Sequence, residues 1–345
     1  EKGACIMSVQ TSSTLLTVSP SPHIHKEHSI TTMMYAVVYS LVPALLMSVY
    51  VFGWSAIYVT FLAIASCMFF EFAISKYFFK QKASVWDGSA IITGVLLAFN
   101  LPASIPWWAI VLGSLFAMGV GKMAFGGLGN NPFNPALVGR VFLLISFPVP
   151  MTQWPEAMNA NRWTMEDATT GATPLAVIKE GLDAGVPISE LTAQIPGFFQ
   201  LFTGMQGGCI GEVSGLALVL GFLYLLYRKI TTWHIPVAVL GTIALITGVL
   251  WLIDPTQYMS PVFHLITGGV LLGALYMATD YVTSPMTPKG MIIFGVGIGV
   301  ITVLIRLWGS YPEGVSFAIL IMNAAVPLID RYFKPKRFGA VRNGK

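Results

Sequence analysis

The sequence predicts an all-α integral membrane protein with about ten transmembrane helices, each about 20 residues long. Hydrophobic residues make up 55% of the chain and charged residues only 10%, and the mean hydropathy is +0.73. Soluble domains carry about 25% charged residues, so this composition indicates a chain that lies mostly in lipid. The formal net charge of +4 comes from basic residues that flank apolar segments, which does not indicate nucleic-acid binding.

Ten apolar segments follow one another along the chain. The third and fifth are shorter than a full span and are bounded by Pro102, Pro106, Pro148 and Pro150, so either is a candidate for a broken or re-entrant helix. The segments are 32–52, 56–79, 88–101, 106–125 and 136–150 in a first half, and 212–228, 235–253, 262–279, 290–308 and 314–333 in a second.

The basic residues predict the orientation. With ten crossings, sixteen Lys and Arg residues fall on the side of the N-terminus, and only Arg162, Lys179 and Arg306 fall on the other. By the positive-inside rule, both termini are then cytoplasmic. The predicted organisation is a cytoplasmic arm at 1–31, a first membrane half at 32–150, an external loop at 151–211, a second membrane half at 212–333 and a cytoplasmic tail at 334–345.

The two halves are predicted to be inverted relative to one another. Each half contains an odd number of segments, so the second half enters the membrane from the opposite side. A weak internal echo supports this division, because Ile92-Thr-Gly-Val-Leu-Leu-Ala98 is similar to Ile266-Thr-Gly-Gly-Val-Leu-Leu-Gly-Ala274. The expected fold is therefore two inverted five-helix halves, with possible broken or re-entrant helices.

The external loop contains the stretch Asp167-Ala-Thr-Thr-Gly-Ala-Thr173-Pro174. Pro174 suits the first position of a helix, which makes Thr173 the N-cap of a short helix that runs to about Leu182. The N-terminus of a helix favours a phosphate through its free N–H groups and its dipole. The pattern thus predicts a threonine hydroxyl at a place where a phosphate is favoured, and the alternative is an ordinary capped turn.

The same stretch resembles the flavinylation motif Asp-x-x-(Ser/Thr)-Gly-Ala-Thr of the RnfD and NqrB family, the membrane subunits of ion-pumping redox complexes. In that family, the last threonine carries FMN through a phosphoester, which a separate flavin transferase attaches from FAD. Carried over by position, the resemblance implies FMN on Thr173, with Asp167, Thr170, Gly171 and Ala172 completing the motif.

The resemblance also implies a function. It is that of a membrane electron-carrier subunit, not catalytic alone, in a ferredoxin–NAD (Rnf-type) oxidoreductase complex of the bacterial inner membrane that moves sodium ions or protons. The implied partners are the other membrane and peripheral subunits of the complex, including a second covalent-FMN subunit and iron–sulfur subunits, together with the flavin transferase. The sequence leaves open whether a second, non-covalent flavin (riboflavin) binds.

A polar loop, Gly126-Gly-Leu-Gly-Asn-Asn-Pro-Phe-Asn-Pro135, separates two apolar segments. Its glycines permit a close backbone approach, and Asn130, Asn131 and Asn134 supply amide donors and acceptors. These residues suit a flavin ring, a quinone-like ring or a contact with a partner. A tight interhelical turn is the alternative interpretation.

Glu71 stands inside the apolar run Cys67–Phe72, where a charged side chain is costly. This position favours a step on an ion path. The alternative is a structural ion pair with a cation such as Lys76 or Arg140.

Two other classes of function compete with the electron carrier. Ten helices in inverted halves are also typical of a secondary transporter or a channel, and a passive scaffold for redox partners is a third hypothesis. Cys5, Cys67 and Cys209 are scattered, so we expect this chain to ligate neither an iron–sulfur cluster nor another metal.

Overall fold

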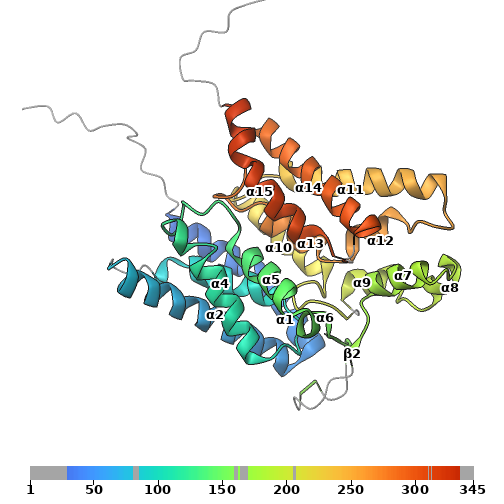
Figure 1. Ribbon diagram of the computed structural model, residues 1–345, viewed down its shortest axis with the longest axis horizontal. Helices are drawn as coiled ribbons and strands as arrows, with labels where there is room; N and C mark the ends of the chain where they lie inside the picture. Colours follow the sequence, from blue (N-terminus) through green and yellow to red (C-terminus); the bar gives the residue numbers. More distant parts are fainter. Residues whose placement is uncertain are drawn as a thin grey trace, which may run out of the picture.

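In the computed structural model, the chain is built almost entirely of helices (Figure 1). The structure describes residues 29–80, 85–158, 162–163, 170–204, 207–309, 311 and 313–334. Asp167 of the motif, and nearly all of the predicted N-terminal arm and C-terminal tail, lie outside the described residues. Within the described ranges, the β-structure is a two-residue ladder, which confirms the prediction of an all-α protein.

Helices occupy each of the five apolar segments of the first half. Ser29 caps the first of them by accepting a hydrogen bond from the Thr32 N–H, and Gly53, with φ of +65°, separates the first two helices by a turn that other residues rarely adopt. The elements are α1 (Ile30–Phe52), α2 (Trp54–Ala73), the π-helical turn η1 (Ile74–Phe78), the 3-10 turn η2 (Val85–Asp87), α3 (Ser89–Phe99), α4 (Trp107–Gly119), the 3-10 turn η3 (Met123–Phe125), α5 (Pro135–Ser146) and α6 (Pro148–Thr152).

The predicted external loop folds into short elements with an apolar core of their own. Strand β1 (Trp154–Pro155) pairs antiparallel with β2 (Thr170–Gly171), and three helices follow: α7 (Pro174–Asp183), α8 (Ile188–Ala193) and α9 (Phe198–Thr203). The core joins these helices to α12 of the second half and contains Leu175, Ile178, Ile188, Leu191, Leu201, Met259 and Phe263. Burial of these apolar side chains fixes the loop helices against the membrane part.

The second half contains α10 (Gly215–Tyr227), α11 (His234–Ile253), α12 (Pro261–Ile266), α13 (Val270–Leu272), the π-helical turn η4 (Gly273–Met277), α14 (Pro288–Trp308) and α15 (Val315–Tyr332). The segment 262–279 is broken between α12 and α13. At the break, Gly268 and Gly269 have φ of +70° and +67°. A residue with a side chain is strained at such angles, so the two glycines permit the break.

The same packing pattern occurs in both halves. In the first half, α2 packs on α3 and on α4, and α4 packs on α5. In the second half, α11 packs on α12 and on α14, and α14 packs on α15. Helix α1 joins the halves by packing on α10 (Figure 1).

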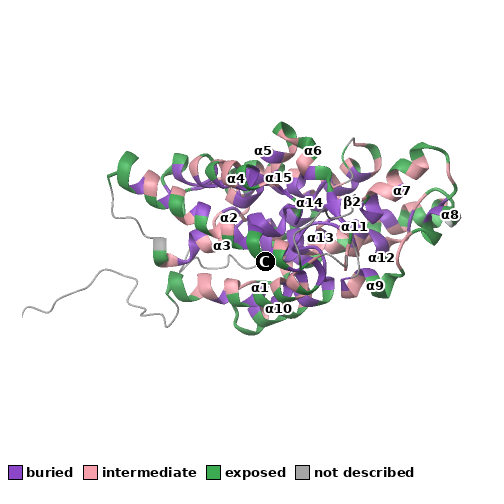
Figure 2. Cartoon of the chain, turned by 90° about the horizontal axis from the view of Figure 1, so that it is seen from below, coloured by how far each residue is buried: buried purple, intermediate pink, exposed green. Residues whose placement is uncertain are grey.

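The outward faces of the helices are apolar and exposed. Leu252, Phe61 and Leu245 are 74%, 71% and 67% exposed, whereas the buried residues gather between the helices (Figure 2). Among the described residues, six helices are long and apolar enough to cross a membrane, namely α1, α2 with η1, the region of α4, α11, α14 and α15, and α3, α5 and α10 are shorter apolar helices. An exposed apolar surface of this extent fits lipid and not water, so the chain is a multi-pass membrane protein.

The helical bundle has two distinct ends. The starts of α1, α3, α5 and α11 and the ends of α4, α10 and η4 contribute to a single pocket, and we call this the pocket end. The segment 151–211 contacts the opposite end, which we call the loop end. There the Trp54 N–H donates to the Arg162 carbonyl (3.2 Å) and the Ile210 N–H donates to the Leu101 carbonyl (3.1 Å).

The structure places the main helix break differently from the expectation. Segment 88–101 contains an unbroken helix, α3, and segment 136–150 is interrupted only at Phe147, between α5 and α6. The long interruption lies in 262–279, which the hydropathy pattern presents as continuous. Apolar composition does not reveal this break, because the two adjacent glycines and a buried cation that binds the freed carbonyls cause it.

Candidate functional site

Thr173 caps helix α7 as the sequence predicts. The residue has extended backbone angles (φ −66°, ψ 152°), and its Oγ accepts a hydrogen bond from the Ala176 N–H at 3.2 Å. Pro174 occupies the first helical position, and the helix ends at Asp183, one residue beyond the expected end. Thr173 is 5% exposed, whereas the neighbouring Ala172 is exposed. The hydroxyl therefore lies just beneath the surface at the positive end of a ten-residue helix.

Two attachments hold the Thr173 segment at the loop end. The β-ladder pairs Gly171 with Trp154 and Thr170 with Pro155, immediately before the cap. On α7, Lys179 Nζ donates to the Gly309 and Tyr311 carbonyls, which follow the end of α14. Burial lowers the pKa of Lys179, and the charge of Asp183 opposes this shift. The structure thus fixes the segment on both sides of the threonine.

Beside α7, a buried arginine stabilises the broken helix. Arg306 of α14 donates from Nη1 to the His264 carbonyl (2.7 Å) and from Nη2 to the Thr267 (2.7 Å) and Gly268 (3.0 Å) carbonyls. These are carbonyls that the end of α12 leaves without helical partners. A Cβ on Gly268 would overlap the Arg306 guanidinium and would lie 3.3 Å from Leu175 Cδ1 on α7. The break, Arg306 and the Thr173 helix therefore form one packed unit.

A second buried arginine links the two halves near this unit. Arg140 of α5 donates to Asn100 Oδ1 (2.6 Å), and it forms an ion pair with Glu313, which precedes α15. The thiol of Cys209 lies 3.7 Å from Arg140 Nη2. Cys209, Glu212 and Glu313 place their ligand atoms within 4.8 Å of one another. The sequence analysis did not single out Asn100 or Glu313, because their contacts join positions far apart in the chain.

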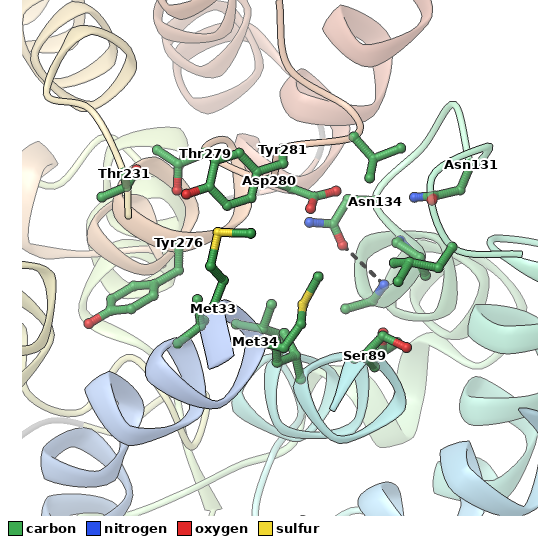
Figure 3. A pocket seen from close by; sticks show the side chains of 18 of the residues that line it. Met33, Met34, Ser89, Asn131, Asn134, Thr231, Tyr276, Thr279, Asp280 and Tyr281 are labelled. Atoms are coloured by element: carbon green, nitrogen blue, oxygen red, sulfur yellow. Dashed lines mark hydrogen bonds between the residues drawn. The ribbon is translucent and has the colours of Figure 1, made fainter. Parts of the chain in front are cut away.

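At the pocket end, helices from both halves surround a cavity (Figure 3). Its free space is about 930 Å³ including the open mouth, within the range of about 300–1,000 Å³ for small-molecule sites. The lining is mostly apolar with a few polar groups, which is typical of a cofactor site. The lining includes Met33, Met34, Ser89, Ile92, Thr93, Leu96, Lys122, Asn131, Asn134, Leu225, Thr231, Tyr276, Thr279, Asp280 and Tyr281.

The asparagine loop divides between the pocket and the surface. Asn131 and Asn134 are buried (4% and 3% exposed) and line the pocket, whereas Asn130 is exposed and does not line it. Asn134 caps α5, because its Oδ1 accepts from the Ala136 N–H (3.1 Å), and its Nδ2 donates to the Met277 carbonyl of η4 (3.2 Å). The loop is thus both an interhelical turn and a wall of the pocket.

Asp280 follows η4 and lines the same pocket (Figure 3). Burial raises the pKa of its carboxyl, while hydrogen bonds from the Thr283 hydroxyl and from the backbone act in the opposite direction. The sequence suggests only a residue at the end of a helix here. The structure adds Asp280, Tyr276 and Lys122 to the groups around the pocket.

Glu71 is buried and forms an ion pair, with a partner other than the two that the sequence suggested. Its Oε1 lies 2.7 Å from Lys122 Nζ. Lys76 instead lies over the Phe72 and Tyr77 rings, and Arg140 pairs with Glu313, so both suggested partners were wrong. Lys122 follows α4, which packs on α2, and this packing brings together two charges 51 residues apart in the chain.

Comparison with known proteins identifies the family. Residues 17–339 match the model of the NQR2, RnfD, RnfE family. The chain belongs to this family. It is 45% identical over 330 residues to the RnfD-type subunit of the sodium-translocating ferredoxin:NAD(+) oxidoreductase complex of Acetobacterium woodii, a match that covers 95% of this chain and 96% of the relative.

Two further relatives have similar coverage. The corresponding subunit of the proton-translocating ferredoxin:NAD(+) oxidoreductase complex of Clostridium ljungdahlii is 41% identical over 332 residues, which cover 95% of this chain and 97% of the relative. That of the ion-translocating oxidoreductase complex of Stutzerimonas stutzeri is 40% identical over 336 residues, which cover 92% of this chain and 94% of the relative. The resemblance that the motif indicated therefore extends over almost the whole chain.

Proposed function

We propose that this chain is the RnfD-type membrane subunit of an ion-translocating ferredoxin:NAD oxidoreductase complex, and that it carries electrons on an FMN esterified to Thr173. The observation that carries the proposal is the coincidence of the family match with the local geometry. The match covers residues 17–339, and the threonine that the motif selects is the N-cap of α7. A hydroxyl at this position is well placed to become a phosphoester.

The residues around Thr173 fit a flavin phosphate. The first turn of α7 directs its dipole and the N–H groups of Leu175 and Ala176 toward the cap, which favours a negative charge. Gly171 has no side chain to obstruct the approach. FMN would supply one- and two-electron chemistry that no side chain of this site supplies. Because Thr173 is only 5% exposed, the flavin transferase would act on a conformation in which the segment between β2 and α7 is opened.

The pocket is the proposed site of a second, non-covalent flavin such as riboflavin. The buried amides of Asn131 and Asn134 can both donate and accept hydrogen bonds, as the ring carbonyls and the ring N–H of a flavin require. Met33, Met34 and Tyr276 provide apolar contact for the ring faces. The two cofactors would then lie at opposite ends of the bundle, which suits transfer of electrons across the membrane.

The proposed topology has ten crossings in two inverted halves, with both termini cytoplasmic and 151–211 outside. The alternating helix ends and the repeated packing pattern support this arrangement. A cysteine in place of Ala184, an exposed residue directly after α7, tests the orientation. We expect an impermeant thiol reagent to label it in intact cells. Labelling that requires lysis would invert the proposed topology and place Thr173 on the cytoplasmic side.

A channel or secondary transporter remains the second candidate, because the break between α12 and α13 supports it as well. Half-helix ends inside a membrane protein commonly build ion sites. The relatives named for sodium ions and for protons are 45% and 41% identical to this chain, so overall identity does not select the ion.

Covalent flavin separates the electron carrier from a transporter without a cofactor. We expect the protein made together with its flavin transferase to fluoresce in a denaturing gel, and its intact mass to exceed that of the protein made without the transferase by one FMN. A chain that gains neither mass nor fluorescence would contradict the proposed function.

A further inference from the structure

The buried ion pair near the pocket holds a lysine ammonium in a cluster of oxygen atoms. Lys122 Nζ donates to Glu71 Oε1 and to Ser89 Oγ, both at 2.7 Å. The side chains of Lys122 and Glu71 are only 2% and 7% exposed. Ser89 Oγ in turn donates to Asp87 Oδ1 at 2.6 Å. Oxygen ligands of this kind are those that hard cations prefer, so the ammonium stands where a small cation could bind.

Glu71 has a carboxylate oxygen that the ion pair does not use. Its Oε2 is buried and has no hydrogen-bond partner among the described residues. A buried acceptor without a partner costs about 1–3 kcal/mol, and such groups often accompany a function. The π-helical turn η1 begins three residues after Glu71, and π-turns are frequent at functional sites.

Lys122 stands between this carboxylate and the pocket. Lys122 and Ser89 line the pocket at its end of the bundle, whereas Glu71 does not reach it. Two negative groups can therefore compete for one ammonium: the Glu71 carboxylate on one side, and any negative charge that enters the pocket on the other. A lysine has a flexible four-carbon stem and a compact charge, which suit it to such an exchange.

We propose that Lys122 is a charge-exchange residue that couples the redox state of the pocket to cation binding at Glu71. While the pocket is neutral, the ammonium occupies the cation position at Glu71. When an electron enters the pocket, the ammonium turns toward it, and Glu71 takes up one monovalent cation, a sodium ion or a proton. This inference rests on the proposed electron-carrying function.

The charges balance at each stage. The arriving electron adds one negative charge to the pocket, which Lys122 compensates, and the incoming cation replaces the positive charge that Glu71 has lost. When the electron leaves, Lys122 returns to Glu71 and displaces the cation. An uncompensated charge at either place is expensive in a buried, weakly solvated environment, so the electron and the cation move together.

The first test removes the ammonium from the complete complex in its oxidised state. In Lys122→Met, Glu71 must take another cation. We expect either thermal stabilisation that grows with the logarithm of the sodium concentration and does not occur with choline, or the infrared carbonyl band of a protonated carboxyl. The first outcome assigns a sodium site and the second a proton site. Both signals should be lost in the double variant Lys122→Met/Glu71→Gln.

The second test uses the wild-type complex and needs no substitution that risks folding. The reduced-minus-oxidised infrared spectrum should show a change of the Glu71 carboxyl band, which Glu71→Gln removes and Lys122→Arg weakens. A spectrum without this change, in samples whose flavin fluorescence is normal, would overturn the exchange. An absence of flavin in the same samples would instead overturn the proposed function, so the two failures are distinguishable.

Discussion

The two ends of the bundle build their polar sites in different ways. At the loop end, Thr173 depends on a local pattern, in which a threonine, a proline and one helical turn place the hydroxyl. At the pocket end, Lys122, Glu71 and Asn134 come from three separate segments and reach the same region only through helix packing. A local site is visible in the sequence, whereas an assembled site requires the fold.

This contrast predicts that changes at one end leave the cofactor at the other end in place. The largest expected effect is at Thr173. In Thr173→Ala, covalent FMN should be lost completely, because no hydroxyl remains to form the ester, while riboflavin bound in the pocket should be retained. Intact mass measures the first cofactor, and flavin released on denaturation measures the second.

Two variants separate the ester from the helix cap. Thr173→Asn keeps a side-chain acceptor for the Ala176 N–H but has no hydroxyl, so it should lose FMN without the cost of about 0.5–2 kcal/mol for an uncapped helix. Thr173→Ser keeps both the cap and the hydroxyl and should retain FMN. Full FMN on Thr173→Asn would place the ester on another residue.

The next effect in size is expected at the helix break. In Arg306→Ala, three buried carbonyls lose a charged donor. Loss of a buried charged partner typically costs about 3–5 kcal/mol, and we expect the amount of folded protein and its unfolding temperature to fall accordingly. Arg306→Lys retains a charge with fewer donors and should lie between this variant and the wild type. Unfolding of the purified protein in detergent measures the difference.

The sequence predicted the class of fold, the position of the helices and the Thr173 cap, because each depends on residues that are close in the chain. Hydropathy marks a membrane helix through its own composition, and Thr-Pro marks a helix start through backbone geometry. By contrast, the partner of Glu71 was not predictable. Lys76 is close in the chain but points to aromatic rings, and Lys122 reaches Glu71 because α4 packs on α2.

The helix break shows the same limit. Thr267, Gly268 and Gly269 belong to an apolar run, and the echo with Ile92–Ala98 suggested the same structure for both stretches. Yet the first copy is an unbroken helix, and its Gly94 packs against the backbone at Ile64. In the second copy, an additional glycine and the guanidinium of Arg306 stabilise the interruption. A single distant cation thus changes the structure of a similar segment.

A smaller effect is expected at the junction of the pocket with both halves. Asn134 caps α5 and also donates to the Met277 carbonyl of the second half. Asn134→Ala should lose both contacts, and the lost cap alone costs about 0.5–2 kcal/mol. Asn134→Ser keeps the cap but not the contact with Met277. If the contact between the halves shapes the pocket, both variants should retain less riboflavin, with only Asn134→Ala also losing stability.

The smallest effect is expected at Asn131, which sharpens the comparison within a single loop. Asn131 is buried and lines the pocket, and its Nδ2 donates to the Phe133 carbonyl at 3.1 Å. Asn130, its neighbour, is exposed and does not line the pocket. Removal of one hydrogen-bonding group from a binding site costs about 1 kcal/mol, so Asn131→Ala should weaken riboflavin binding roughly fivefold. Asn130→Ala, the matched control, should leave binding unchanged. Fluorescence titration of flavin-depleted protein gives both affinities. Equal losses in the two variants would show that the loop acts as a whole and that Asn131 is not a pocket contact. In both variants, the covalent FMN on Thr173 should remain at the wild-type level, because the loop end is built without these residues.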